Sequence, residues 1–179
     1  MTDFPNLALP LDANGRPVFG DSAFWVEKQI TTNASNATAT PALFTVIGSV
    51  LITKLFGVVV TDLGSNHTIA SLRINDQTAQ VYLTAVGGTT LSAIKAGSLI
   101  VKTGLVAAAI TKIDNVAGAV AEPTTIQTLE FSPVIVTKKT GALTQIEYRY
   151  ATTQTPTTGA IKFKAAFLPL SDDGDLVAV

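Results

Sequence analysis

The chain has no cysteine and only one histidine, His67, among its 179 residues. Without cysteine it can form neither a disulfide framework nor a thiolate nucleophile or metal ligand. A single histidine cannot build the usual zinc site, and any Ser-His-Asp arrangement would have to use His67. Because His67 follows the polar stretch Gly-Ser-Asn, we expect it in an exposed turn with no chemical role.

Charged residues are scarce as well, at 14% of the sequence against roughly 25% in an average soluble domain. The 12 basic and 13 acidic residues give a net charge of −1, and no basic cluster predicts a nucleic-acid partner. Hydrophobic residues make up 47% of the chain, which suffices for a core. Either threonine, serine, asparagine and glutamine cover much of the surface, or other chains bury much of it.

Long uninterrupted apolar runs are also missing. The most apolar stretch, 99–121, is interrupted by Lys102, Lys112 and Asp114, whereas a membrane-spanning helix needs about 20 predominantly apolar residues. The first twelve residues have no basic region of the kind that begins a secretory signal. We therefore expect a soluble protein with no membrane partner.

The pattern that is present is that of short β-strands. In the stretch 143–170, apolar and polar side chains alternate in two segments separated by the turn-forming residues 154–159, which predicts an antiparallel hairpin with one buried face. The predicted buried positions are Ile146, Tyr148, Tyr150, Ile161, Phe163, Ala165 and Phe167. Their aromatic members could form a binding platform, but core packing is favoured because polar residues such as Glu147 take the opposite face.

Eight to ten such strands are expected, separated by glycine, proline and asparagine. The stretch 42–63 is too long for one typical strand, so it is either two strands or one bent strand that crosses between sheets. No alternation of strands with helices competes with this pattern. The sequence therefore predicts an all-β protein, an antiparallel β-sandwich that is jelly-roll-like.

Three regions are expected along the chain. Residues 1–22 contain three prolines among apolar residues and predict an extended N-terminal arm, which lies either on its own domain or on a neighbouring subunit. Residues 23–171 form the β-sandwich domain, and residues 172–179 form an acidic C-terminal tail. The candidate interface residues are Phe4, Leu7, Leu9, Leu11, Val18, Phe19, Leu176 and Val177.

No residue pattern predicts catalysis, a metal site or a cofactor. A carboxylate pair for sugar cleavage would have to lie within about 5–10 Å, and the spacing of the acidic residues selects none. These scattered acidic residues are Asp62, Asp76, Asp114, Glu122, Glu130 and Glu147. Asp172, Asp173 and Asp175 could bind calcium, but they lack the twelve-residue loop spacing and the closing glutamate, which favours a solvated tail. We expect a protein that is not an enzyme.

Three segments, 41–59, 66–74 and 158–177, together resemble a group of small virion structural proteins of tailed bacteriophages. Members of that group share an LFTVTG-like strand followed by LFG, and end in a strand of the form GxIKWxLxYxPLDDG. The chain reads LFTVIG and LFG at the first motif, and GAIKFKAAFLPLSDDG at 159–174. It departs from the second motif at Phe163, where the group often has tryptophan, and at the inserted Ser171.

The resemblance covers most of residues 41–174 and leaves the arm outside it. It implies a capsid cement or decoration protein that bridges subunits of the major capsid protein and stabilises the head shell. It also implies self-association, with a trimer favoured, and a location on the capsid surface of the virion after synthesis in the host cytoplasm. The alternatives are a tail or fibre component that binds the host surface, and a carbohydrate-binding β-sandwich.

Overall fold

The computed structural model describes residues 23–32, 38–63, 67–85, 89–91, 94–102, 109–113, 132–152 and 159–179. The expected arm at 1–22 lies outside this part of the chain. The same is therefore true of six candidate interface residues, namely Phe4, Leu7, Leu9, Leu11, Val18 and Phe19.

The described strands form two sheets, and every pairing among them is antiparallel. The six-stranded sheet has the order β1 (Phe24–Thr32), β12 (Gly159–Pro169), β4 (Ser49–Thr61), β8 (Leu99–Lys102), β9 (Ile110–Ile113), with β10 (Val134–Thr137) also paired to β4. The seven-stranded sheet has the order β13 (Asp175–Ala178), β3 (Ala42–Ile47), β11 (Gln145–Thr152), β5 (His67–Asn75), β6 (Gln80–Tyr82). In that sheet β2 (Thr38–Ala39) also pairs with β11, and β7 (Thr89–Leu91) with β5.

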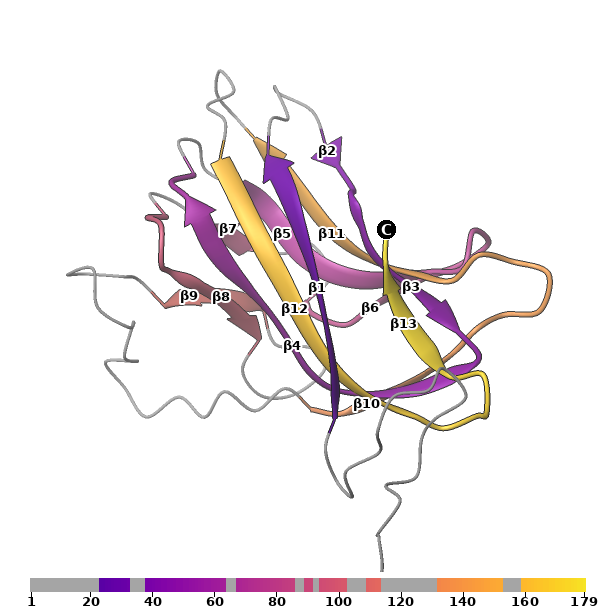
Figure 1. Cartoon of the computed structure of the whole chain (residues 1–179). Coiled ribbons are helices and arrows are strands. Elements are labelled where there is room, and N and C mark those ends of the chain that lie inside the picture. The colour runs from indigo at the N-terminus through magenta and orange to yellow at the C-terminus, as the bar shows by residue number, and fades with distance from the viewer. Residues whose placement is uncertain are drawn as a thin grey trace, which may run out of the picture.

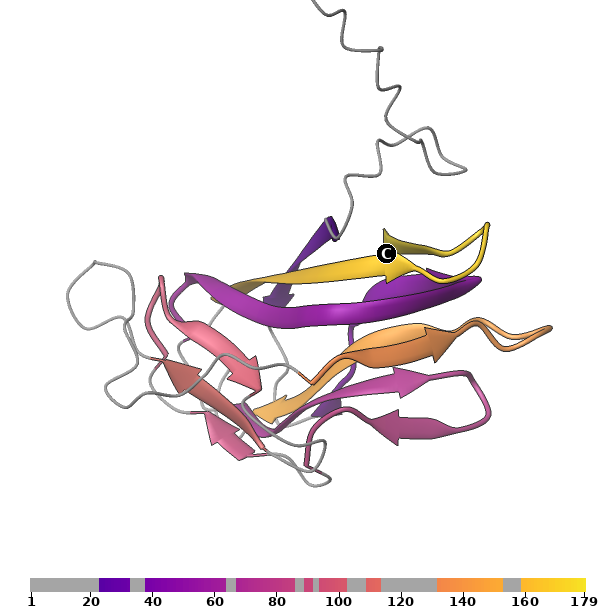
Figure 2. The same cartoon turned by 90° about the horizontal axis from the view of Figure 1, so that it is seen from below.

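The two sheets pack against each other as a β-sandwich, which confirms the predicted fold class (Figure 1). Seen from below, β12 and β4 lie in one layer, and β11 and β5 lie in the other (Figure 2). The jelly-roll-like connectivity stays a prediction. None of the described residues belongs to a helix long and apolar enough to cross a membrane.

The predicted buried face is confirmed, and it forms the centre of the core. Among the described residues, the largest fully buried side chains include Tyr148, Tyr150, Phe44, Phe163 and Phe167. Alternation along β11 and β12 directs the rings of the two tyrosines, Phe163 and Phe167 inward, and the rings of Tyr148 and Phe163 meet with centroids 5.0 Å apart. The aromatic platform that could have bound a sugar is therefore inside the protein, so that alternative loses the side chains on which it depended.

The predicted hairpin, by contrast, is wrong. β11 pairs with β3 and β5 in one sheet, whereas β12 pairs with β1 and β4 in the other. The two segments thus face each other across the core. Alternation identifies which side of a strand is buried, but it does not identify the neighbouring strand, and a facing pair buries the same residues as a hairpin.

The stretch 42–63 consists of two strands that belong to different sheets, which was one of the two arrangements expected. β3 ends at Ile47 and β4 begins at Ser49, and Gly48 between them has φ of 54°. L-residues rarely adopt this left-handed conformation. A side chain at position 48 would also collide with Ser171 and Asp173, so glycine allows the chain to cross between sheets here.

The segment predicted as a C-terminal tail is part of the sandwich. Residues Asp175–Ala178 form β13, which pairs with β3 from Asp175 opposite Ile47 to Ala178 opposite Phe44. Leu176 is 3% exposed and belongs to the core, which corrects its prediction as an interface residue. Asp172 and Asp173 suggested a solvated tail, but the residues that follow them form a strand at the end of the seven-stranded sheet.

Candidate docking surface

An apolar surface lies on the outward face of the six-stranded sheet. β4 places Leu55 and Val59 in the core, and the intervening side chains Phe56 and Val58 point outward. Strands that are apolar on both faces are typical of sheets covered on both sides. Here the outward face includes Trp25, which is 57% exposed, and Val60, which is 45% exposed.

A pocket of about 290 Å³ occupies this face, and we call it the Trp25 pocket. Its lining includes Trp25, Lys54, Phe56, Leu99, Val101 and Lys102. Strand register brings these side chains together, because Trp25 on β1 lies opposite Ala166 of β12, which in turn lies opposite Lys54 of β4. The rings of Trp25 and Phe56 meet edge to face, with centroids 6.2 Å apart and planes at 78°.

The far wall of the pocket is a small apolar cluster separate from the main core. Val101 of β8 is 4% exposed, and Phe56 and Leu99 pack against it. Because the neighbouring strands support this wall, the pocket is formed before any partner binds. Preformed apolar pockets with an aromatic anchor are typical of the central residues of protein–protein interfaces.

Lysines surround the pocket and make this face cationic. Lys54 is exposed, whereas Lys102 is buried. Burial lowers the pKa of the Lys102 ammonium. Lys162 and Lys164 of β12 lie beside the pocket, and their Nζ atoms are 3.1 and 3.6 Å from the two carboxylate oxygens of Glu27. The hydrogen bond from Lys162 is the main cause that lowers the pKa of Glu27. Lys162 and Lys164 thus share one glutamate.

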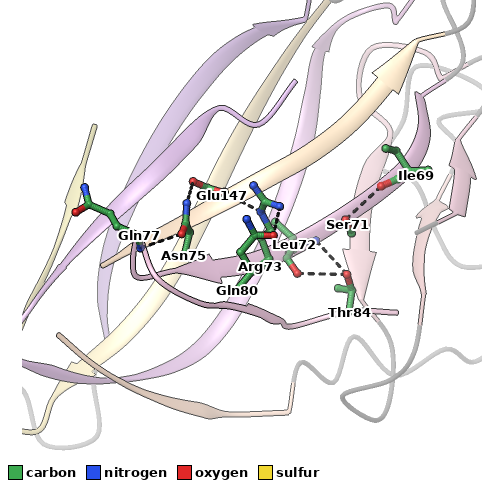
Figure 3. Close-up of polar contacts among 9 residues, drawn as sticks. All are labelled: Ile69, Ser71, Leu72, Arg73, Asn75, Gln77, Gln80, Thr84 and Glu147. Atoms are coloured by element: carbon green, nitrogen blue, oxygen red, sulfur yellow. Dashed lines mark hydrogen bonds and ion pairs between the residues drawn. The ribbon is translucent and has the colours of Figure 1, made fainter. Parts of the chain in front are cut away.

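The outward face of the other sheet is polar, and its groups satisfy one another (Figure 3). Arg73 of β5 donates from Nε to Glu147 of β11 at 2.7 Å and from Nη1 to Gln80 of β6 at 2.6 Å. Asn75 donates to the other oxygen of Glu147 at 2.8 Å. The sequence predicted Glu147 to be in water, but it is 6% exposed. These four side chains form one connected hydrogen-bond network on this face.

His67 corrects a further expectation, because it is 1% exposed and lies in the core. Its ring stacks on Tyr150 with centroids 4.5 Å apart, and Nδ1 is 3.0 Å from the hydroxyl of Tyr148. Burial lowers the pKa of His67 to about 4, so the ring is neutral at neutral pH. The polar residues before it indicated a turn, but β5 begins at His67 itself.

The acidic residues considered for catalysis have separate structural partners where the structure describes them. Asp62 pairs with Lys95 at 3.0 Å, and Asp76 accepts backbone hydrogen bonds from Thr78 and Ala79 in a turn. Asp114, Glu122 and Glu130 lie outside the described residues. Within the described ranges, no group of three histidine or acidic side chains could hold a metal ion.

A second apolar groove, of about 360 Å³, runs between β6 and β10 at the side of the sandwich. Its lining includes Val81 and Ile135, which are 58% and 64% exposed. Val81 lies on β6, an edge strand of only three residues. This groove is lined by one aromatic residue, Tyr82, and so lacks the aromatic pair of the Trp25 pocket.

Sequence reasoning missed the Trp25 pocket. It directed attention to the arm and to Leu176 and Val177, of which Val177 is 42% exposed on β13 and stays a prediction. A signal was nonetheless present, because β4 is apolar at consecutive positions rather than alternate ones. Comparison of the chain with protein-family models, curated proteins and solved structures found no match.

Proposed function

We propose that this chain is a noncatalytic structural protein of a bacteriophage virion, a capsid cement protein that bridges subunits of the major capsid protein. The observation that carries the proposal is the Trp25 pocket, a preformed apolar surface on the outside of a stable sandwich. The resemblance of residues 41–174 to small virion proteins supports the phage assignment. The described acidic residues that were considered for catalysis each have a structural partner, which favours a binding role.

The mechanism is the burial of surface across joints between subunits. Removing apolar surface from water contributes about 25 cal/mol per Å², less the cost of ordering the groups that bind. An aromatic pair such as Trp25 and Phe56 contributes a large area with few rotatable bonds. In a shell the same contact recurs in many copies, and once one contact forms, high effective concentration favours the next.

Labelling of purified phage particles with an antibody fragment against the sandwich tests this function. A capsid cement protein labels the whole head surface, and amine cross-linking should join Lys54, Lys162 or Lys164 to the major capsid protein or to another copy of this chain. Label confined to the tail would contradict the head assignment and favour the tail or fibre alternative. Absence of the chain from particles would contradict a virion role altogether.

A further inference from the structure

We propose that a second copy of this chain occupies the Trp25 pocket, and that it does so with the loop between β12 and β13, residues 170–174. This inference deepens the proposed function, on which it rests for the expectation of a multi-copy assembly. It names the partner of the pocket and the surface by which that partner binds.

The charge of the pocket restricts its occupant. Lys54 lines it, Lys164 of β12 lies opposite Phe56, and Lys162 and Lys164 share one carboxylate, that of Glu27. Two such faces pressed together would bring like charges into contact, which costs free energy and disfavours a face-to-face pair. The occupant must therefore combine apolar side chains with a net negative charge.

The 170–174 loop has both properties. Leu170 is 50% exposed, and Asp172 and Asp173 are also exposed, with Asp175 directly after them. The sequence contains no lysine or arginine after Lys164, and Asp172 and Asp173 give this loop a negative charge. An exposed leucine beside carboxylates is complementary to an aromatic pocket surrounded by ammonium groups.

The loop is held in shape before binding. The backbone N–H of Ser49 donates to Oγ of Ser171 at 2.8 Å, and Oγ of Ser171 donates to Asp173 at 2.7 Å. The N–H of Leu170 donates to the carbonyl of Ser49, and the N–H of Gly174 to that of Ser171, each at 2.8 Å. A loop fixed in this way loses little conformational entropy on docking.

The two surfaces are neighbours on the same strand. Ala166 of β12 lies between Trp25 and Lys54 in the register of the sheet, and Leu170 follows it by four residues, about 13 Å along an extended chain. Where the rotation between copies closes, complementary patches on one subunit generate a closed oligomer, either a reciprocal pair or a ring in which each copy passes its loop to the next. The test does not depend on which of these forms.

Light scattering coupled to size-exclusion chromatography, over a range of protein and salt concentrations, tests the inference on the full chain. The wild-type protein should be a closed oligomer that dissociates as salt increases. Lys54→Glu in the pocket and Asp172→Lys in the loop should each weaken association and raise the apparent dissociation constant about tenfold. The double variant should associate more tightly than either single variant, because the opposite charges are exchanged.

Lys95→Glu is the matched control, since it makes the same charge change at an exposed residue that lies outside the pocket lining and the loop, and it should leave the molar mass unchanged. A wild-type monomer at every concentration would overturn the inference, as would an oligomer that ignores both single substitutions or a double variant without recovery. If deletion of residues 1–22 abolishes the oligomer while both charge changes leave it intact, the arm and not the loop occupies the pocket. The arm has three aspartates and one arginine. Particle labelling tests the virion role independently.

Discussion

At the scale of single residues, His67 shows most clearly how the fold changes the chemistry of a side chain. Its ring packs in one cluster with those of Tyr148 and Tyr150, and Nε2 has no hydrogen-bond partner in the part of the chain that the structure describes. Burial disfavours the charged form of each group: it lowers the pKa of His67 and raises that of Tyr148, so both stay neutral in the folded protein. The core therefore contains a base that resists protonation.

This arrangement predicts a loss of stability in mild acid. The pKa of His67 is 6.5 in the unfolded chain and about 4 in the folded one, so below pH 6.5 the unfolded state binds the extra proton. The free energy of unfolding should fall by about 2 kcal/mol between pH 7 and pH 5, as measured by urea denaturation. The loss should level off below the folded pKa.

His67→Phe keeps an aromatic ring against Tyr150 and removes the titrating group. Its free energy of unfolding should change little between pH 7 and pH 5, whatever its absolute stability. The carboxylates with lowered pKa values, Glu27, Asp62 and Asp76, have ordinary values of 4.5 or below, so their effects fall mainly under this window. A pH dependence equal to that of the wild type would show that another group is responsible.

The periodicity of the sequence predicts which side of a strand a residue lies on, and this explains which residues were correctly predicted to be buried. Alternation identified Tyr148, Phe163 and Phe167 as core residues, because the side of a strand on which a residue lies depends only on its position along that strand. It failed for His67 and Glu147, because the burial of each depends on partners that other strands supply. The local polarity of the sequence indicated that both side chains are exposed to solvent. The fold instead packs His67 against the ring of Tyr150 and pairs Glu147 with the guanidinium of Arg73.

At the scale of elements, the pair formed by Arg73 and Glu147 joins the two central strands of the seven-stranded sheet. Both side chains are 8% exposed, and the two residues lie directly opposite each other in the register of β5 and β11. A buried ion pair of this kind is weak evidence for stability relative to apolar residues, but removal of one partner leaves an uncompensated charge.

Glu147→Leu should therefore lower the free energy of unfolding by about 3 kcal/mol or more, since it leaves the guanidinium of Arg73 buried without its carboxylate. The double variant Arg73→Met/Glu147→Leu removes both charges and should recover most of that loss. Urea denaturation of the single variants, the double variant and the wild type measures the difference. Equal destabilisation in the Glu147→Leu single and the double variant would mean that the ion pair is not the relevant interaction.

Prediction of the elements themselves was accurate for strand positions and poor for strand neighbours. The segments around 24–32, 145–152 and 159–169 were identified from β-branched and aromatic alternation. Their pairing was not, because β11 and β12 are adjacent in sequence but lie in opposite sheets. The role of Gly48 as the crossing point between sheets depends on its left-handed backbone and on the close approach of Ser171 and Asp173 in the 170–174 loop.

At the scale of the whole molecule, the two outward faces have opposite characters. The face of the seven-stranded sheet closes on itself through Arg73, Glu147, Asn75 and Gln80. The face of the six-stranded sheet exposes an aromatic pair surrounded by lysines. The low overall charge left two explanations open, a surface of uncharged polar residues or burial by other chains. The arrangement of strands identifies this face as the candidate for such burial.

The central claim is that a partner covers the Trp25 pocket in the working state of the protein. Trp25 is the only tryptophan in the chain, so its fluorescence reports on this position without any substitution. Acrylamide quenching should be strong in dilute protein at high salt, and it should decrease, with a shift of the emission to shorter wavelength, as the protein associates at low salt. Emission and quenching that stay those of an exposed indole under all these conditions would contradict the account.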